Sequence, residues 1–135
     1  MTNGELARSY LRRAERRLRF LQLAFDDDGY PDVVRVAQEI IELALKAMLR
    51  EAGVEPPRWH DVGSILREHR KRFPPDVDVE RLAAISKLLT SERELSFYGR
   101  EDFIPEREYT REQAMQALND ATWVMSVATD LIGGH

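Results

Sequence analysis

Residues 31–52 read PDVVRVAQEIIELALKAMLREA, and this stretch decides the fold. At about 100° per residue on a helix, its apolar side chains cover more than half of the circumference. A helix that is apolar so far round must pack on several sides, so we expect it at the centre of a helical bundle. Pro31 and Asp32 suit a first helical turn, and Gly53 is expected to end the helix in the left-handed conformation.

Four further segments show helical periodicity on either side of this central stretch. The expected helices are 4–25, 61–71, 78–97 and a last one that begins at Thr110 and runs to the glycine pair 133–134. Thr110 and Gln113 have the spacing of a capping box. Prolines separate the helices, and no turn signal joins two alternating apolar runs, so we expect no sheet. The sequence predicts an all-α fold: an up-and-down antiparallel helical bundle of four to five helices in one domain, 1–135.

The composition bounds the class of protein. The chain has 135 residues, 43% of them hydrophobic and 33% charged, which suits one soluble globular domain. Cysteine is absent, so disulfide scaffolds, Cys-based zinc sites and cysteine nucleophiles are excluded, and we expect a cytoplasmic protein. No apolar run approaches the roughly 18–20 residues of a membrane span, so we expect no membrane partner.

Charge is divided unevenly along the chain. Residues 1–25 contain six arginines and two acids, a net charge of +4. Because the whole chain has a net charge of −4, the remaining residues have a net charge of −8. On the first helix, four arginines fall on one stripe beside the apolar face: Arg8, Arg12, Arg16 and Arg19. Such a stripe is either a solvated face or a docking site for phosphate or for an acidic partner. RNA is the less favoured partner because the overall charge is negative and aromatic residues do not alternate with the arginines.

Standard catalytic and cofactor motifs are missing. The three histidines, at positions 60, 69 and 135, show no metal-ligand spacing. Neither GxxxxGK[ST] nor GxGxxG occurs. We therefore expect no metal, no cofactor and no conventional catalytic residues.

Glu39 and Lys46 break the apolar pattern of the central helix, because they lie seven residues apart on its narrow polar arc. Glu42 lies at i−4 from Lys46, so an intrahelical salt-bridged strip is one interpretation. A ligand- or partner-binding role for Glu39 and Lys46 is the other.

Arg93 falls near Leu82 on the helical wheel, so it points along the apolar face of its helix. A guanidinium directed inward needs an anion. That anion is either a carboxylate of the same fold, with Glu39 as a candidate, or a ligand or partner chain.

Two stretches together resemble the HEPN domain family. The first is residues 36–49, VAQEIIELALKAML, followed by Gly53, Pro56-Pro57 and His60-Asp61-Val62. The second is residues 93–99, RELSFYG, followed by Ile104-Pro105 and Tyr109. The likeness covers nearly the whole chain.

The resemblance implies a helical bundle that, like most of the family, forms a homodimer. It also implies either a minimal nucleotidyltransferase as partner, in a toxin–antitoxin or stress system, or a stand-alone module that binds nucleotides. Many members of the family are metal-independent ribonucleases with an Arg-x(4–6)-His motif. Arg93 matches the arginine of that motif, whereas Tyr98 stands in the position of the histidine. Tyrosine, with an ordinary pKa of about 10, is a poor general base at neutral pH.

We therefore expect a non-catalytic module that binds a nucleotide or a nucleotidyltransferase partner. Arg93, Tyr98 and Lys46 would contact phosphate or partner carboxylates, and Glu39 would orient Arg93. The alternative is a metal-independent ribonuclease toxin with a degenerate Arg-x4-His site, using Arg93 with Tyr98 or with His60.

Overall fold

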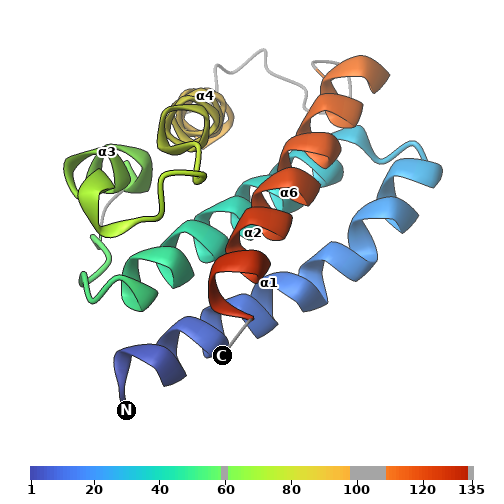
Figure 1. The fold of residues 1–135 in the computed structure, drawn as a ribbon. Helices are drawn as coiled ribbons and strands as arrows, with labels where there is room; N and C mark the ends of the chain where they lie inside the picture. The colour runs from blue at the N-terminus through green and yellow to red at the C-terminus, as the bar shows by residue number, and fades with distance from the viewer. Residues whose placement is uncertain (59–60, 98–108, 134–135) are drawn as a thin grey trace.

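The computed structural model describes residues 1–58, 61–97 and 109–133, and for residues 89–97 it describes the backbone alone. Figure 1 shows the helices of this part of the chain, which contains no strand. They are α1 (Asn3–Asp26), α2 (Tyr30–Glu51), α3 (Val62–Glu68), the 3-10 turn η1 (Arg70–Arg72), α4 (Val79–Phe97) and α6 (Arg111–Ile132). The expected all-α fold of four to five helices is confirmed, with five α-helices in the described part of the chain.

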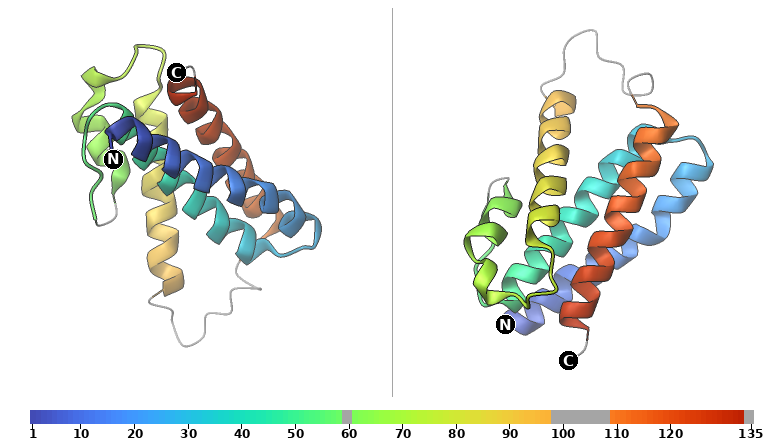
Figure 2. Two further views of the ribbon diagram at one scale, coloured as in Figure 1. Left: turned by 90° about the horizontal axis from the view of Figure 1, so that it is seen from below. Right: turned by 45° about the horizontal axis from the view of Figure 1, so that its top comes forward.

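The long helices alternate in direction. Helices α1 and α2 lie side by side and antiparallel, and α6 packs on both of them, running in the direction of α2 (Figure 1). Helix α4 runs opposite to α6 and contacts α2, and α3 packs mainly against α4 (Figure 2). The order is therefore up and down, as expected. Helix α4 is steeply inclined to the others: it is seen almost end-on in Figure 1, whereas α1, α2 and α6 run across the view.

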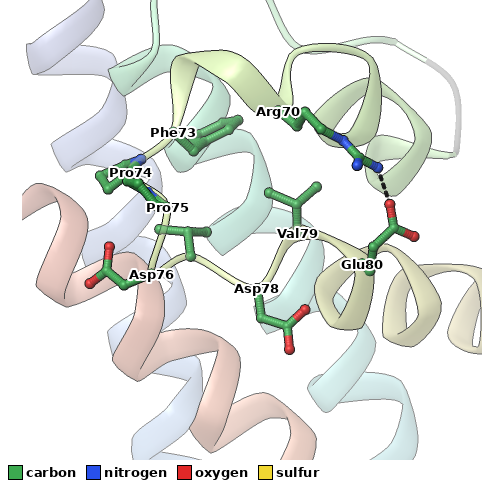
Figure 3. A pocket seen from close by; sticks show the side chains of 9 residues that line it. Arg70, Phe73, Pro74, Pro75, Asp76, Asp78, Val79 and Glu80 are labelled. Atoms are coloured by element: carbon green, nitrogen blue, oxygen red, sulfur yellow. Dashed lines mark hydrogen bonds and ion pairs between the residues drawn. The ribbon is translucent and has the colours of Figure 1, made fainter.

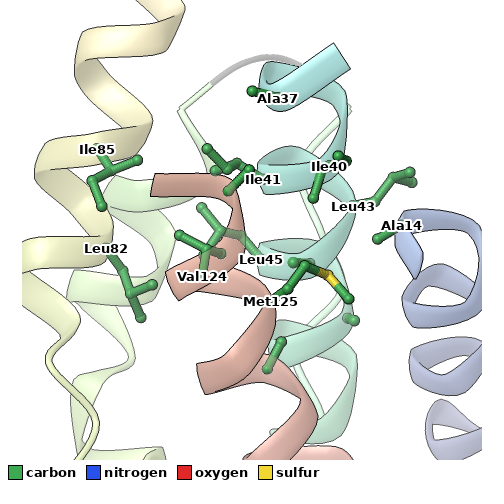
Figure 4. Packing of buried hydrophobic residues seen from close by; sticks show 14 of the residues in the cluster. Ala14, Ala37, Ile40, Ile41, Leu43, Leu45, Leu82, Ile85, Val124 and Met125 are labelled. Carbon is green, nitrogen blue, oxygen red and sulfur yellow. The ribbon is translucent and has the colours of Figure 1, made fainter. Parts of the chain in front are cut away.

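Helix α2 is the centre of the core, as its composition predicts. Half of its 22 residues are buried: Val33, Val34, Ala37, Ile40, Ile41, Leu43, Ala44, Leu45, Ala47, Met48 and Leu49. In Figure 4, Ala14 of α1 lies on one side of these side chains, and Val124 of α6 and Leu82 of α4 lie on the other. Burying these side chains against α1, α3, α4 and α6 removes a large apolar area from water, which is the dominant favourable term in folding.

The helix ends follow the expected local chemistry. Gly53 follows α2 with φ +80°, a conformation that glycine adopts without the strain a Cβ would add. At α6, the backbone N–H of Gln113 donates to Oγ1 of Thr110 at 3.1 Å, and the N–H of Thr110 donates to Oε1 of Gln113 at 2.8 Å. The predicted capping box is confirmed.

The third helix is shorter than its expected range of 61–71. Asp61 precedes it as the N-cap, with its Oδ1 accepting from the N–H of Ser64 at 3.2 Å. At the other end, the N–H of His69 is shared between the carbonyls of Ile65 and Leu66, at 3.1 and 3.2 Å. This tightening ends the α-helix, and the chain continues as the separate turn η1.

Among the described helices, none combines the length and the apolarity that a membrane crossing requires.

Candidate functional site

Arg93 and Tyr98 were expected to form the centre of the site. Arg93 belongs to α4 and lies near the end of that helix. The structure describes its backbone but not its side chain. Tyr98 lies outside the described residues altogether. The described site residues are therefore Glu39 and Lys46 of α2 and the four arginines of α1.

Glu39 has a partner on α1. The Nε–H of Arg17 donates to Oε2 of Glu39 at 3.1 Å, and the Arg17 Nη1 donates to the carbonyl of Arg13 at 3.2 Å. The two side chains of the ion pair are 37% and 42% exposed, so water screens the interaction. Glu39 thus faces α1. The expected contact of Glu39 with Arg93 falls on a side chain that is not described.

Lys46 forms an intrahelical ion pair. Its Nζ lies 3.2 Å from Oε1 of Glu42, one helical turn away, with the two side chains 21% and 27% exposed. The salt-bridged strip that the sequence suggested is therefore confirmed for this pair. Because the pair is mostly covered, Lys46 can bind an added anion only by sharing its charge between that anion and Glu42.

The polar edge of α2 extends in both directions from these residues. Arg35 and Asp32 form an ion pair at 3.3 Å near the start of the helix. Near its end, Arg50 donates through Nη1 to Oδ1 of Asn3 on α1 at 3.3 Å. The polar edge of α2 therefore contacts α1 at two residues, Arg17 and Asn3. Two of its polar side chains, Glu39 and Arg50, thus hold the two helices together.

The stripe on α1 is fully on the surface. Arg8, Arg12, Arg16 and Arg19 are all exposed, whereas Ala7, Leu11, Ala14, Leu21 and Phe25 of the same helix are buried. The division of α1 into a core face and an arginine face is thus as expected. Docking of phosphate or of an acidic partner on this face stays a prediction.

One buried carboxylate was missed by the sequence analysis. Asp120 of α6 is 7% exposed, and its Oδ1 accepts from Nε2 of Gln116 at 2.9 Å. Trp123, one turn further along α6, lies beneath the guanidinium of Arg81 of α4 at 3.8 Å from the ring centroid. Residues three apart share a flank of a helix, so Asp120 lies on the α6 flank that faces α4. The sequence does contain a sign of this burial: Asp120 stands between Ala117 and Val124, at a position where the helical repeat of α6 places a buried residue.

A hollow of about 480 Å³ lies where α3 leads into α4 (Figure 3). It is lined by Arg70, Phe73, Pro74, Pro75, Asp76, Val77, Asp78, Val79 and Glu80. Arg70, Asp78 and Glu80 of this lining have partners within the fold. Glu80 pairs with Arg70, drawn as a dashed line in Figure 3, and with Arg67. Asp78 accepts from the N–H of Arg81 at 3.0 Å at the start of α4. None of the expected site residues lines this hollow.

The environment of Tyr30 perturbs its pKa. Desolvation and then a 3.1 Å hydrogen bond from its hydroxyl to Oδ1 of Asp28 raise the pKa of Tyr30 above its ordinary value. Its ring packs near that of Phe25, with centroids 5.9 Å apart. These contacts stabilise the turn between α1 and α2, so we assign Tyr30 a structural role.

Within the described ranges, no group of three or more His, Asp or Glu side chains is placed to hold a metal ion.

Comparison with known proteins gives two matches. Residues 7–131 match the model of the HEPN domain. The chain is also 28% identical over 138 aligned residues to a protein of Methanocaldococcus jannaschii named "Putative toxin MJ1304". That alignment covers 96% of this chain and 90% of the archaeal protein.

Proposed function

The chain belongs to the HEPN domain family, and on this premise we propose that it is a toxin-related HEPN module that acts by binding and not by cleaving RNA. Its ligand would be a nucleotide or a minimal nucleotidyltransferase partner, bound by a homodimer. One observation carries the proposal: Tyr98 stands five residues after Arg93, where the Arg-x4-His motif of the ribonuclease members has histidine.

The substitution matters because of proton transfer. Histidine, with an ordinary pKa of about 6.5, exchanges a proton readily at neutral pH. Tyrosine, with an ordinary pKa of about 10, keeps its phenolic proton at that pH. A phenol can donate a hydrogen bond to a phosphate or a carboxylate but is a poor general base. A site of Arg93 and Tyr98 is therefore suited to holding an anion.

The arginine supplies most of the proposed binding. A guanidinium presents a planar fork of donors that matches phosphate and carboxylate oxygens in a bidentate arrangement. Helices α2 and α4 contact each other, and in the proposed site Lys46 of α2 contributes a second positive charge. The expected role of Glu39 is weakened, because that carboxylate already has Arg17 as a partner.

A second candidate is an RNA-cleaving toxin. It is favoured by the name of the archaeal relative, which includes the word toxin. Such an enzyme would use Arg93 with Tyr98, or with His60. It predicts cleavage that depends on Arg93 and persists in the presence of a metal chelator.

Titration calorimetry tests the binding proposal directly. The wild-type chain is titrated with ATP, with GTP and with the product of the neighbouring gene. We expect binding of at least one of these, lost on Arg93→Ala and retained on Lys71→Ala. Lys71 is a fitting control because it is an exposed cation of η1. The proposal fails if the wild type binds none of the three.

A further inference from the structure

The outward face of α1 carries apolar as well as basic side chains. Along this helix, four arginines follow one another at intervals of four, four and three residues, and Leu23 comes four residues later on the same line. Phe20 lies beside Leu23 at the same end. We call this surface the α1 stripe: Arg8, Arg12, Arg16, Arg19, Phe20 and Leu23.

The apolar members of the α1 stripe are unusually exposed. Phe20 is 64% and Leu23 65% exposed, more than any other large apolar side chain that the structure describes in a helix. They do not serve the core, because the buried residues of α1 occupy the opposite face. Figures 1 and 2 show α1 at one edge of the bundle, with α2 and α6 on its inner side. An exposed apolar patch that contains an aromatic ring and lies beside several arginines is typical of a protein–protein interaction surface.

The four arginines of the α1 stripe have no ion-pair partner among the residues that the structure describes. Within the same residues, none of the four has a hydrogen bond to another side chain. The other two arginines of α1 do have contacts: Arg17 pairs with Glu39, and Arg13 lies 5.8 Å from the ring centroid of Tyr10. Four such positive charges on one line, in a chain of net charge −4, indicate a surface shaped for an anionic occupant.

The geometry of the stripe limits what that occupant can be. Arg8 and Leu23 are fifteen residues apart, about 22 Å along the helix axis at 1.5 Å per residue. A second copy of the same helix, placed antiparallel across a two-fold axis, would bring the middle arginines of both stripes together. Like charges so placed repel, which disfavours self-pairing through this surface.

We propose that the α1 stripe docks an acidic amphipathic helix of a partner protein. The carboxylates of that helix would face Arg8, Arg12, Arg16 and Arg19, and its apolar residues would cover Phe20 and Leu23. Charge would steer the encounter, and burial of Phe20 and Leu23 would hold the complex. This inference is independent of the role proposed for Arg93, which lies on α4.

RNA and anionic membranes fit the surface less well. Single-stranded RNA binders place aromatic rings along the basic groove, whereas Phe20, the aromatic member of the α1 stripe, stands at the end of the row. An anionic membrane would meet the exposed carboxylates of residues 26–28 directly beyond Leu23.

A fluorescence anisotropy titration with a defined probe tests the proposal. The probe is a labelled helical peptide of about five turns, with glutamates at the spacing of the stripe and two leucines at one end. A scrambled peptide of the same composition is the reference. The stripe variants are Arg12→Glu with Arg16→Glu, and Phe20→Ser with Leu23→Ser. Their matched controls are Lys71→Glu and Leu88→Ser, which change an exposed cation and a 53% exposed leucine elsewhere.

We expect the wild type and both controls to bind the ordered peptide, and each stripe variant to bind it at least about tenfold more weakly. The affinity of the wild type should fall with salt, and that dependence should flatten in the arginine variant. Circular dichroism confirms that the variants are folded. Equal affinity for the scrambled peptide, or no binding by the wild type, would overturn the proposal. Tighter binding of an RNA oligonucleotide or of phosphatidylserine vesicles through the same residues would also overturn it. Loss of nucleotide binding in the Arg93 variant leaves this result unchanged.

Discussion

Arg17 of α1 donates from Nε to Oε2 of Glu39 on α2 at 3.1 Å, which ties together the first two helices of the bundle. The polar edge of α2 therefore faces α1 at this point. Glu39 thus has a structural role in joining the two helices.

Removal of the Arg17–Glu39 ion pair should change stability only slightly. Because both side chains are more than a third exposed, a double-mutant cycle of Arg17→Met and Glu39→Gln should give a coupling of about 0.2–1 kcal/mol. Urea unfolding of the four proteins measures it, and the coupling should shrink at high salt. A coupling of several kcal/mol would mean that Glu39 belongs to a larger charged network.

Gly63 is expected to tolerate no side chain. A Cβ at this position of α3 would lie 2.9 Å from Cα of Ala83 and 2.9 Å from Cβ of Ser86, both on α4. Gly63→Ala should therefore lower the free energy of unfolding by about 1–3 kcal/mol through overpacking.

Gly4→Ala is the control for Gly63→Ala, because a Cβ at Gly4 would first meet the end of the Arg8 side chain, at 3.5 Å. It should be neutral or mildly stabilising in the same chemical denaturation experiment. Equal effects of the two substitutions would contradict the close packing of α3 on α4.

Stability should fall above the ordinary pKa of tyrosine. The folded state raises the pKa of Tyr30, so it binds the phenolic proton more tightly than the unfolded chain does. The resulting stabilisation is complete below pH of about 10 and is lost as pH rises through the folded pKa. Thermal unfolding across this range should show a smaller alkaline loss for Tyr30→Phe than for the wild type. Identical slopes would exclude the Tyr30–Asp28 hydrogen bond as a cause.

The chain should form a dimer of about twice 15.7 kDa in analytical ultracentrifugation. Leu23→Glu on α1 should leave the dimer intact, because the like charges of the α1 stripe disfavour self-pairing through that surface. A wild-type monomer at all concentrations would contradict the expected homodimer.

Local periodicity was sufficient to predict the fold class. The apolar circumference of residues 31–52 placed that helix at the centre, because burial on several sides is the way to remove such a surface from water. Residue spacing likewise predicted the pair Glu42–Lys46, since residues four apart on a helix are neighbours.

The contacts between helices could not be predicted from the periodicity of each helix alone. The partner of Glu39 depends on how α1 and α2 are rotated against each other, and the inclination of α4 depends on how two side-chain surfaces fit. The burial of Asp120 followed from the same packing. These relations arise from the assembled bundle, so the sequence pattern of one helix does not contain them.

The central claim, that this HEPN protein binds and does not cleave, is tested most directly by an RNA cleavage assay. The wild type, Arg93→Ala and Tyr98→His are incubated with purified tRNA and with total RNA in the presence of a metal chelator. We predict that the wild type yields no more product than Arg93→Ala, whereas Tyr98→His, which restores the Arg-x4-His spacing, gains cleavage. Cleavage by the wild type that is lost on Arg93→Ala would contradict the account.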